Sequence, residues 1–184
     1  SLDVLQKEIA RLQEQLEHIQ LRVQLNARDR IHERFGDKPI TVTLLLKLMT
    51  EHDHQEPYLK EYPIILELSD DTPHAVNGLL QQIDNKQWDT MLFETIRAGV
   101  VQVSSRKATA SPLIEFIEDS RPCNTAGSVA LHEAVVDQII HVLYLRIYLL
   151  DNAVIPKNEI CIGRVSDGLE ILHRVPIATE PRVN

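Results

Sequence analysis

The sequence LDVLQKEIARLQEQLEHIQLRV, residues 2–23, has an apolar side chain at alternating steps of three and four. This spacing keeps the apolar side chains on one stripe of an α-helix and is typical of a helix that packs against another helix. The intervening residues are mostly Glu, Gln, Lys and Arg, which are good helix formers. We therefore predict that residues 1–35 form a coiled-coil helix for self-association. Its predicted interface consists of Leu2, Leu5, Ile9, Leu12, Leu16, Ile19 and Val23.

The positions that flank the apolar stripe carry few charges. With Leu2 at heptad position a, the e positions are Gln6, Gln13, Gln20 and Ala27, and the g positions are Glu8, Gln15, Arg22 and Asp29. Because no e position is charged, no ion pair between g and e positions specifies a partner. The sequence favours a homo-oligomer, with a dimer first, and a helix of a different protein is the alternative.

The composition indicates one globular body after the helix. The chain has 184 residues, and 43% of them are hydrophobic, which is enough for a core. The formal net charge is −8, from 27 acidic and 19 basic residues. Residues 1–35 contain equal numbers of acidic and basic side chains, so the body carries the excess. An acidic surface repels a phosphate backbone, which disfavours nucleic acid as a partner.

The sequence contains no apolar run near the roughly 18 residues that span a bilayer, and it begins with no basic and apolar leader. We therefore expect a soluble, intracellular protein with no membrane partner. Cys123 and Cys161 match neither the spacing of a metal-ligand pair nor a disulfide framework. We interpret them as buried or incidental thiols in a reducing compartment.

The rest of the chain predicts a mainly helical body. Residues 63–68 fit either a buried strand or a helical turn, and residues 100–103 fit a short strand. The last predicted helix is apolar nearly all round, so we expect it to be the spine of the body. Caps, prolines and apolar spacing indicate helices at residues 39–52, 72–83, 85–99, 111–117 and 128–151.

The clearest β pattern lies at residues 159–175, where two β-rich runs flank a Ser-Asp-Gly turn. A hairpin there requires a positive φ at Gly168, whereas we expect no such requirement at Gly127. The predicted fold class is α+β, mainly α, with an N-terminal coiled-coil helix, a compact helical domain and a small C-terminal β-hairpin. The predicted units are residues 1–35, the oligomerisation helix; 36–175, the globular domain; and 176–184, a loose tail.

One polar pattern on the predicted spine helix suggests a metal site. Glu133, Asp137 and His141 recur every four residues, which would place them on one helix face. Two carboxylates and an imidazole can hold a divalent metal, and His52 and His54 could complete the set. We favour the simpler interpretation that this face is a solvated strip. No metal or cofactor is therefore predicted.

The remaining motifs favour a protein without catalytic activity. Neither a Gly-X-Ser-X-Gly elbow nor a phosphate-binding glycine loop is present. The elements predicted for residues 73–107 have the order of a winged helix, with two helices and then a strand. The charges on the candidate recognition helix, however, are balanced rather than basic. We predict a non-enzymatic structural or adaptor subunit that binds protein partners through its acidic domain. The alternatives are a small metal-dependent helical enzyme at Glu133, Asp137 and His141, and a winged-helix nucleic-acid-binding module.

Overall fold

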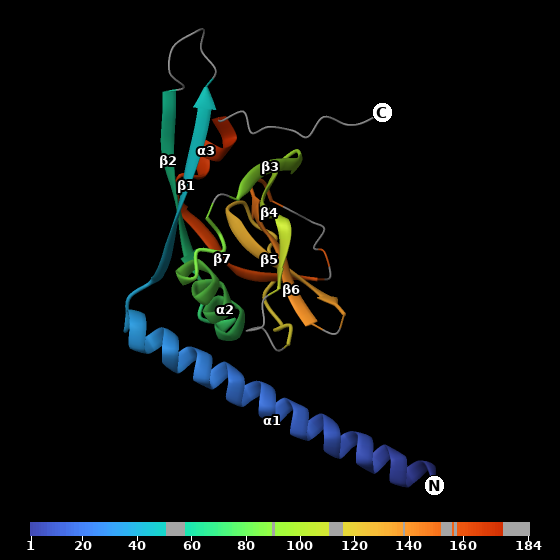
Figure 1. Ribbon diagram of the computed structural model, residues 1–184. Helices are drawn as coiled ribbons and strands as arrows, with labels where there is room; N and C mark the ends of the chain where they lie inside the picture. The colour runs from blue at the N-terminus through green and yellow to red at the C-terminus, as the bar shows by residue number, and fades with distance from the viewer. Residues whose placement is uncertain are drawn as a thin grey trace, which may run out of the picture.

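A computed structural model shows a long N-terminal helix beside a body built on a curled β-sheet (Figure 1). The structure describes residues 1–50, 58–89, 91–110, 116–137, 139–151, 156 and 158–174. Three helices are described within these ranges: α1 (Leu2–Phe35), α2 (Pro73–Asp84) and α3 (Leu169–Arg174). Helix α2 lies between α1 and the strands (Figure 1).

Seven strands of the described chain form one antiparallel sheet in the order β1-β2-β7-β5-β6-β4-β3. The order makes β1 and β3 the two edges and places β5 at the centre. The strands are β1 (Ile40–Thr50), β2 (Tyr58–Leu68), β3 (Leu92–Arg97), β4 (Val100–Ala110), β5 (Ser128–Val136), β6 (Ile139–Tyr148) and β7 (Glu159–Asp167).

The main core lies between the inner face of the sheet and α2. Helix α2 contributes Val76, Leu79 and Leu80, which are all buried. Each strand contributes every second residue, as the two-residue period of a strand requires. Full burial of one such aliphatic side chain stabilises the fold by about 1.5–3 kcal/mol. The buried strand residues include Ile64, Leu66, Val101, Val103, Val129, Leu131, Leu145, Ile147, Ile160 and Ile162.

The prediction of a mainly helical α+β fold is wrong, because the body is mostly β-sheet. The predicted helix at residues 39–52 contains β1, and the one at residues 85–99 contains β3. The predicted spine helix, residues 128–151, is the hairpin of β5 and β6. These strands carry apolar residues on both faces, and a continuous apolar run does not distinguish a buried strand from a buried helix.

Other local predictions are confirmed. The helix predicted at residues 72–83 is α2, with Pro73 in its first turn, where the missing amide hydrogen costs nothing. The strand predicted at residues 100–103 begins β4, and residues 63–68 belong to β2. Most of the helix predicted at residues 111–117 lies outside the described residues.

The C-terminal hairpin is confirmed in its first half and wrong in its second. Its first run is β7, but residues 169–174 form helix α3 rather than a returning strand. Gly168 has a φ of +92°, as the turn requires. The expectation for Gly127 is wrong, because its φ is +87°. The predicted tail at residues 176–184 lies outside the described residues, as do His52 and His54.

Among the described residues, helix α1 contacts the body only near its C-terminal end. Ala27 and Ile31 are its buried residues, and Arg34 forms an ion pair with Asp84 of α2 at 2.6 Å. The description of the protein as an alpha-helical, coiled-coil scaffold is wrong, because the body that follows α1 is mostly a β-sheet. Among the described residues, no helix combines the length and apolar character needed to cross a membrane.

Two glycines provide a test of how closely the turn before α3 packs. At Gly168 an added Cβ would lie 2.7 Å from the Pro63 carbonyl oxygen, whereas at Gly36, with a φ of +62°, it would meet nothing within 4 Å. Alanine is strained at both positions by about 1 kcal/mol, but only Gly168→Ala also clashes. We expect urea denaturation to show a loss of at least about 2 kcal/mol for Gly168→Ala and about 1 kcal/mol for Gly36→Ala. Equal losses would contradict the close contact.

Candidate functional site

On the face of the sheet opposite to the core, four neighbouring strands bring polar and aromatic side chains together. The strand register aligns Gln102 of β4 with Arg146 of β6, and His132 of β5 with Tyr144 of β6. His132 is also aligned with Glu159 of β7. We call this group the outer-face cluster. It consists of Gln102, His132, Tyr144, Arg146, Tyr148 and Glu159.

Arg146 is the centre of the outer-face cluster. Its Nη1 donates to Oε1 of Glu159 at 2.9 Å, and its Nε donates to Oε1 of Gln102 at 3.1 Å. The hydroxyl of Tyr148 donates to the other carboxylate oxygen of Glu159. The Glu159 side chain is only 1% exposed and that of Arg146 is 18% exposed. A guanidinium has five N–H groups, so Arg146 retains donors for a ligand at the surface.

Tyr144 and His132 stack face to face beside the guanidinium, and we call this pair of rings the aromatic wall. Their ring centroids are 4.4 Å apart with an interplanar angle of 6°, and the Arg146 guanidinium lies 4.4 Å from the Tyr144 centroid. Burial lowers the pKa of His132, and the charge of Arg146 lowers it further, against the opposing effect of Glu159. Burial raises the pKa of Tyr144 and of Tyr148. Both tyrosines and His132 are therefore uncharged at neutral pH.

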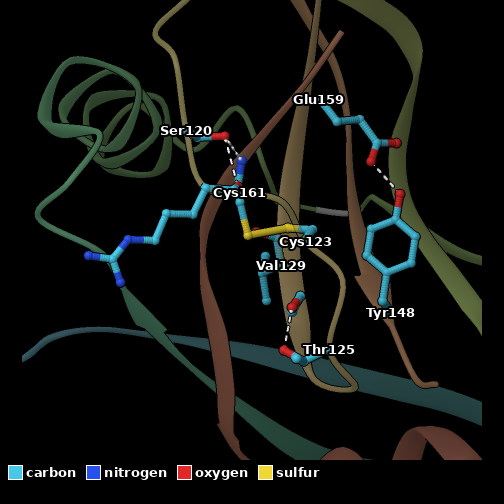
Figure 2. The surroundings of a disulfide bond; sticks show 9 residues. Ser120, Cys123, Thr125, Val129, Tyr148, Glu159 and Cys161 are labelled. Carbon is cyan, nitrogen blue, oxygen red and sulfur yellow. Dashed lines mark hydrogen bonds between the residues drawn. A yellow bond between two sulfur atoms is a disulfide. The ribbon is translucent and has the colours of Figure 1, made fainter. Parts of the chain in front are cut away.

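A disulfide bond between Cys123 and Cys161 holds the segment of residues 116–127 against the same face, next to Tyr148 and Glu159 (Figure 2). The two Cα atoms are 5.3 Å apart, although the cysteines are 38 residues apart in the chain. The hydroxyl of Ser120 accepts a hydrogen bond from the Cys161 amide at 2.8 Å. The prediction of free thiols is therefore wrong.

The same segment carries a buried carboxylate that caps a distant helix. Oε1 of Glu118 accepts from the amide of His74 at 3.1 Å, and Oε2 accepts from the amide of Ala75 at 2.6 Å. These amides lie in the first turn of α2, whose N-cap residue Thr72 makes no side-chain capping bond. Gln24 of α1 donates to Oε1 of Glu118 at 3.0 Å. Residue 118 thereby links α1, α2 and the disulfide-held segment.

The structure separates the predicted metal ligands Glu133, Asp137 and His141. Glu133 is fully buried in β5, Asp137 lies in the exposed turn after it, and the backbone of His141 pairs with Ala134. Within the described residues, no group of three His, Cys, Asp or Glu side chains could hold a metal. The proposed metal-dependent helical site is therefore wrong, because it required one helix face.

Glu133 is nevertheless chemically unusual. Neither of its carboxylate oxygens has a hydrogen-bond partner in the described part of the chain. Burial, together with the smaller effect of the nearby Glu118 charge, raises the pKa of Glu133 to about 8. A carboxyl group without a hydrogen-bond partner in an apolar interior favours its protonated form. Glu133 is thus a neutral acid under ordinary conditions.

The winged-helix alternative is also wrong. Residues 73–107 contain α2 followed directly by the hairpin of β3 and β4, and the helix predicted for recognition is an edge strand. The described part of this segment has no second helix to enter a groove.

Comparisons with known proteins identify the architecture. No family model matches the sequence, and no curated protein matches it. A solved structure, the cyclophilin type peptidyl-prolyl cis-trans isomerase of Cryptosporidium parvum, matches with a TM-score of 0.50 and 12% identity. The match covers 60% of this chain and 75% of that chain. The body resembles a cyclophilin in fold.

This likeness overturns the prediction of a non-enzymatic adaptor. That prediction combined an association helix with a mainly helical body that lacks catalytic motifs. The body instead has a fold that also occurs in an enzyme, and the fold alone does not decide the function.

Sequence reasoning missed the outer-face cluster, although a signal for it was present. In the run Tyr144 to Tyr148, aromatic or charged side chains alternate with aliphatic ones, which is the two-residue period of a strand. The longer apolar run around these residues concealed that alternation and suggested a helix.

Proposed function

We propose that the body binds proline-containing polypeptide segments at the outer-face cluster and catalyses cis-trans isomerisation of the X–Pro bond. The observation that carries this proposal is the partly exposed Arg146 guanidinium beside an uncharged aromatic wall. The likeness of the body to a cyclophilin type peptidyl-prolyl cis-trans isomerase supports the choice of substrate.

The cluster has the chemistry that this reaction needs. Isomerisation makes and breaks no covalent bond, and its barrier of about 18–20 kcal/mol arises from the partial double bond of the amide. An N–H group that donates to the prolyl nitrogen favours the twisted amide, in which the nitrogen lone pair is no longer delocalised. Arg146 has such donors, and its pairing with Glu159 fixes its position.

The aromatic wall suits the rest of the substrate. A proline ring is compact, apolar and already restricted in conformation, so it packs on aromatic side chains at a small entropic cost. His132 and Tyr144 cover one face of each other, so the pair offers its outer surface for such a contact. The low pKa of His132 also matters, because an imidazolium there would repel the guanidinium.

The disulfide refines the expected location. We propose that the protein is intracellular but resides in an oxidising compartment, because disulfides persist there and are reduced in the cytosol.

The proposed activity can be measured by NMR exchange between the cis and trans forms of a proline-containing peptide. We expect the protein to raise the exchange rate at least tenfold, and Arg146→Lys, which lacks the planar fork, to remove most of that increase. Arg164→Lys is the matched control, because Arg164 is also a strand arginine paired with a glutamate, Glu67, at 3.3 Å. An uncatalysed rate with the unaltered protein would refute the proposal.

A further inference from the structure

The apolar stripe of α1 remains open to solvent in a single copy of the protein. The exposed fractions of its first six members lie between 52% for Leu12 and 70% for Leu2. No described residue of the body covers them, and α1 projects past the body at this end (Figure 1). A row of exposed aliphatic side chains of this length marks an interaction surface.

The body is attached to a different stretch of the same helix. The residues of α1 that contact it include Gln24, Ala27, Ile31 and Arg34, which all lie in its C-terminal third. The first six members of the stripe lie before them along the helix axis, at residues 2–19. A second helix can therefore approach this part of the stripe while the body stays attached near the other end of α1.

The charged residues beside the apolar stripe distinguish a parallel from an antiparallel pair of α1 helices. In a parallel pair in register, Arg30 would face Arg30 and Glu33 would face Glu33 across the seam, and no opposite charges would meet at the flanking positions. Both facing pairs carry like charges. A parallel pair would therefore include repulsion as soon as it extended past residue 26.

The antiparallel direction creates opposite-charge pairs instead. When Leu12 faces Leu16 of the second copy, the same register places Leu5 against Val23. Glu8 then lies beside Arg22 of the second copy, and two-fold symmetry repeats this pair. Within the described part of one copy, Arg22 has no ion-pair partner.

We propose that the partner of α1 is a second copy of this chain, and that the two α1 helices pack antiparallel along residues 5–23. The apolar layers match in size, and the flanking charges complement each other only in this direction. The two bodies then lie at opposite ends of the helix pair. This arrangement does not depend on the activity proposed for the outer-face cluster.

The first test is the oligomeric state of the full chain by sedimentation equilibrium. We expect the unaltered protein to have twice the 21.0 kDa chain mass and Leu12→Asp to have the mass of one chain. Leu21→Asp is the matched control, because Leu21 is 53% exposed and Leu12 is 52% exposed, but Leu21 lies on the opposite side of the helix from the stripe. An unaltered protein that is monomeric at tens of micromolar, or a Leu12→Asp variant that remains a dimer, would overturn the proposal.

The second test determines whether the two α1 helices are parallel or antiparallel. Differently tagged Leu5→Cys and Val23→Cys chains are mixed, oxidised mildly and separated on a non-reducing gel. We expect a disulfide between the two different variants and none between identical chains, because residue 5 faces residue 23. Disulfides between identical chains would show a parallel pair, and no disulfide from a dimeric mixture would exclude the register; either result would refute the antiparallel arrangement.

Discussion

Glu133→Gln is expected to remove most of the pH dependence of stability between pH 4.5 and pH 8. The pKa of the Glu133 carboxyl rises from 4.5 to about 8 on folding, so between these values the folded protein binds a proton that the unfolded chain has lost. The unfolding free energy therefore falls as the pH rises through this window. At about 1.4 kcal/mol per pKa unit, the total loss is on the order of 5 kcal/mol.

Urea denaturation at pH 5, 6.5 and 8 measures this effect. A glutamine has no proton to lose, so the Glu133→Gln variant should gain stability relative to the unaltered protein as the pH increases. Glu94→Gln is the control, because Glu94 lies on the edge strand β3 and is only partly buried. If the pH profiles of the unaltered protein and the Glu133→Gln variant run parallel, Glu133 is not protonated in the folded state.

The sequence predicted those elements whose cause is local. The heptad spacing of residues 2–23 and the Thr-Pro pair before α2 are signals within one helix, and both helices are present. By contrast, β5 and β6 are strands because they pair with distant strands and are covered on both faces. A short apolar run does not indicate which distant strands will pair with it or cover it. The hairpin was therefore predicted as one helix.

The candidate site depends even more on distant contacts. Glu159 becomes a buried partner of Arg146 only when β7 pairs with β5, and Cys161 reaches Cys123 through the same pairing. Similarly, Glu118 caps a helix that begins more than 40 residues earlier in the chain. None of these residues belongs to a recognisable motif with its neighbours in sequence. A motif search therefore does not find the candidate site.

Replacing both cysteines, as Cys123→Ala with Cys161→Ala, is expected to cost about 4 kcal/mol of unfolding free energy. The cystine closes a loop between residues 38 apart, and the loss of chain entropy in the unfolded state for that length gives this value. Alanine is preferred to serine because Cys123 is buried and a hydroxyl would lack a partner there. Denaturation of the double variant, beside the unaltered protein with and without a reductant, measures the loss. A change below about 1 kcal/mol would show that the bond does not constrain the chain.

Loss of the disulfide should also loosen the first turn of α2, because the bond holds the segment that carries Glu118. The amides of His74 and Ala75 donate to that carboxylate, and the His74 ring stacks on Phe116 of the same segment at 4.8 Å. We expect hydrogen exchange at these two amides to accelerate at least tenfold in the double alanine variant. The amide of Val76 is the internal control, because it donates to the Thr72 carbonyl within the helix at 3.0 Å and does not depend on Glu118. If all three amides accelerate equally, the helix has been destabilised as a whole and the Glu118 cap is not specifically released.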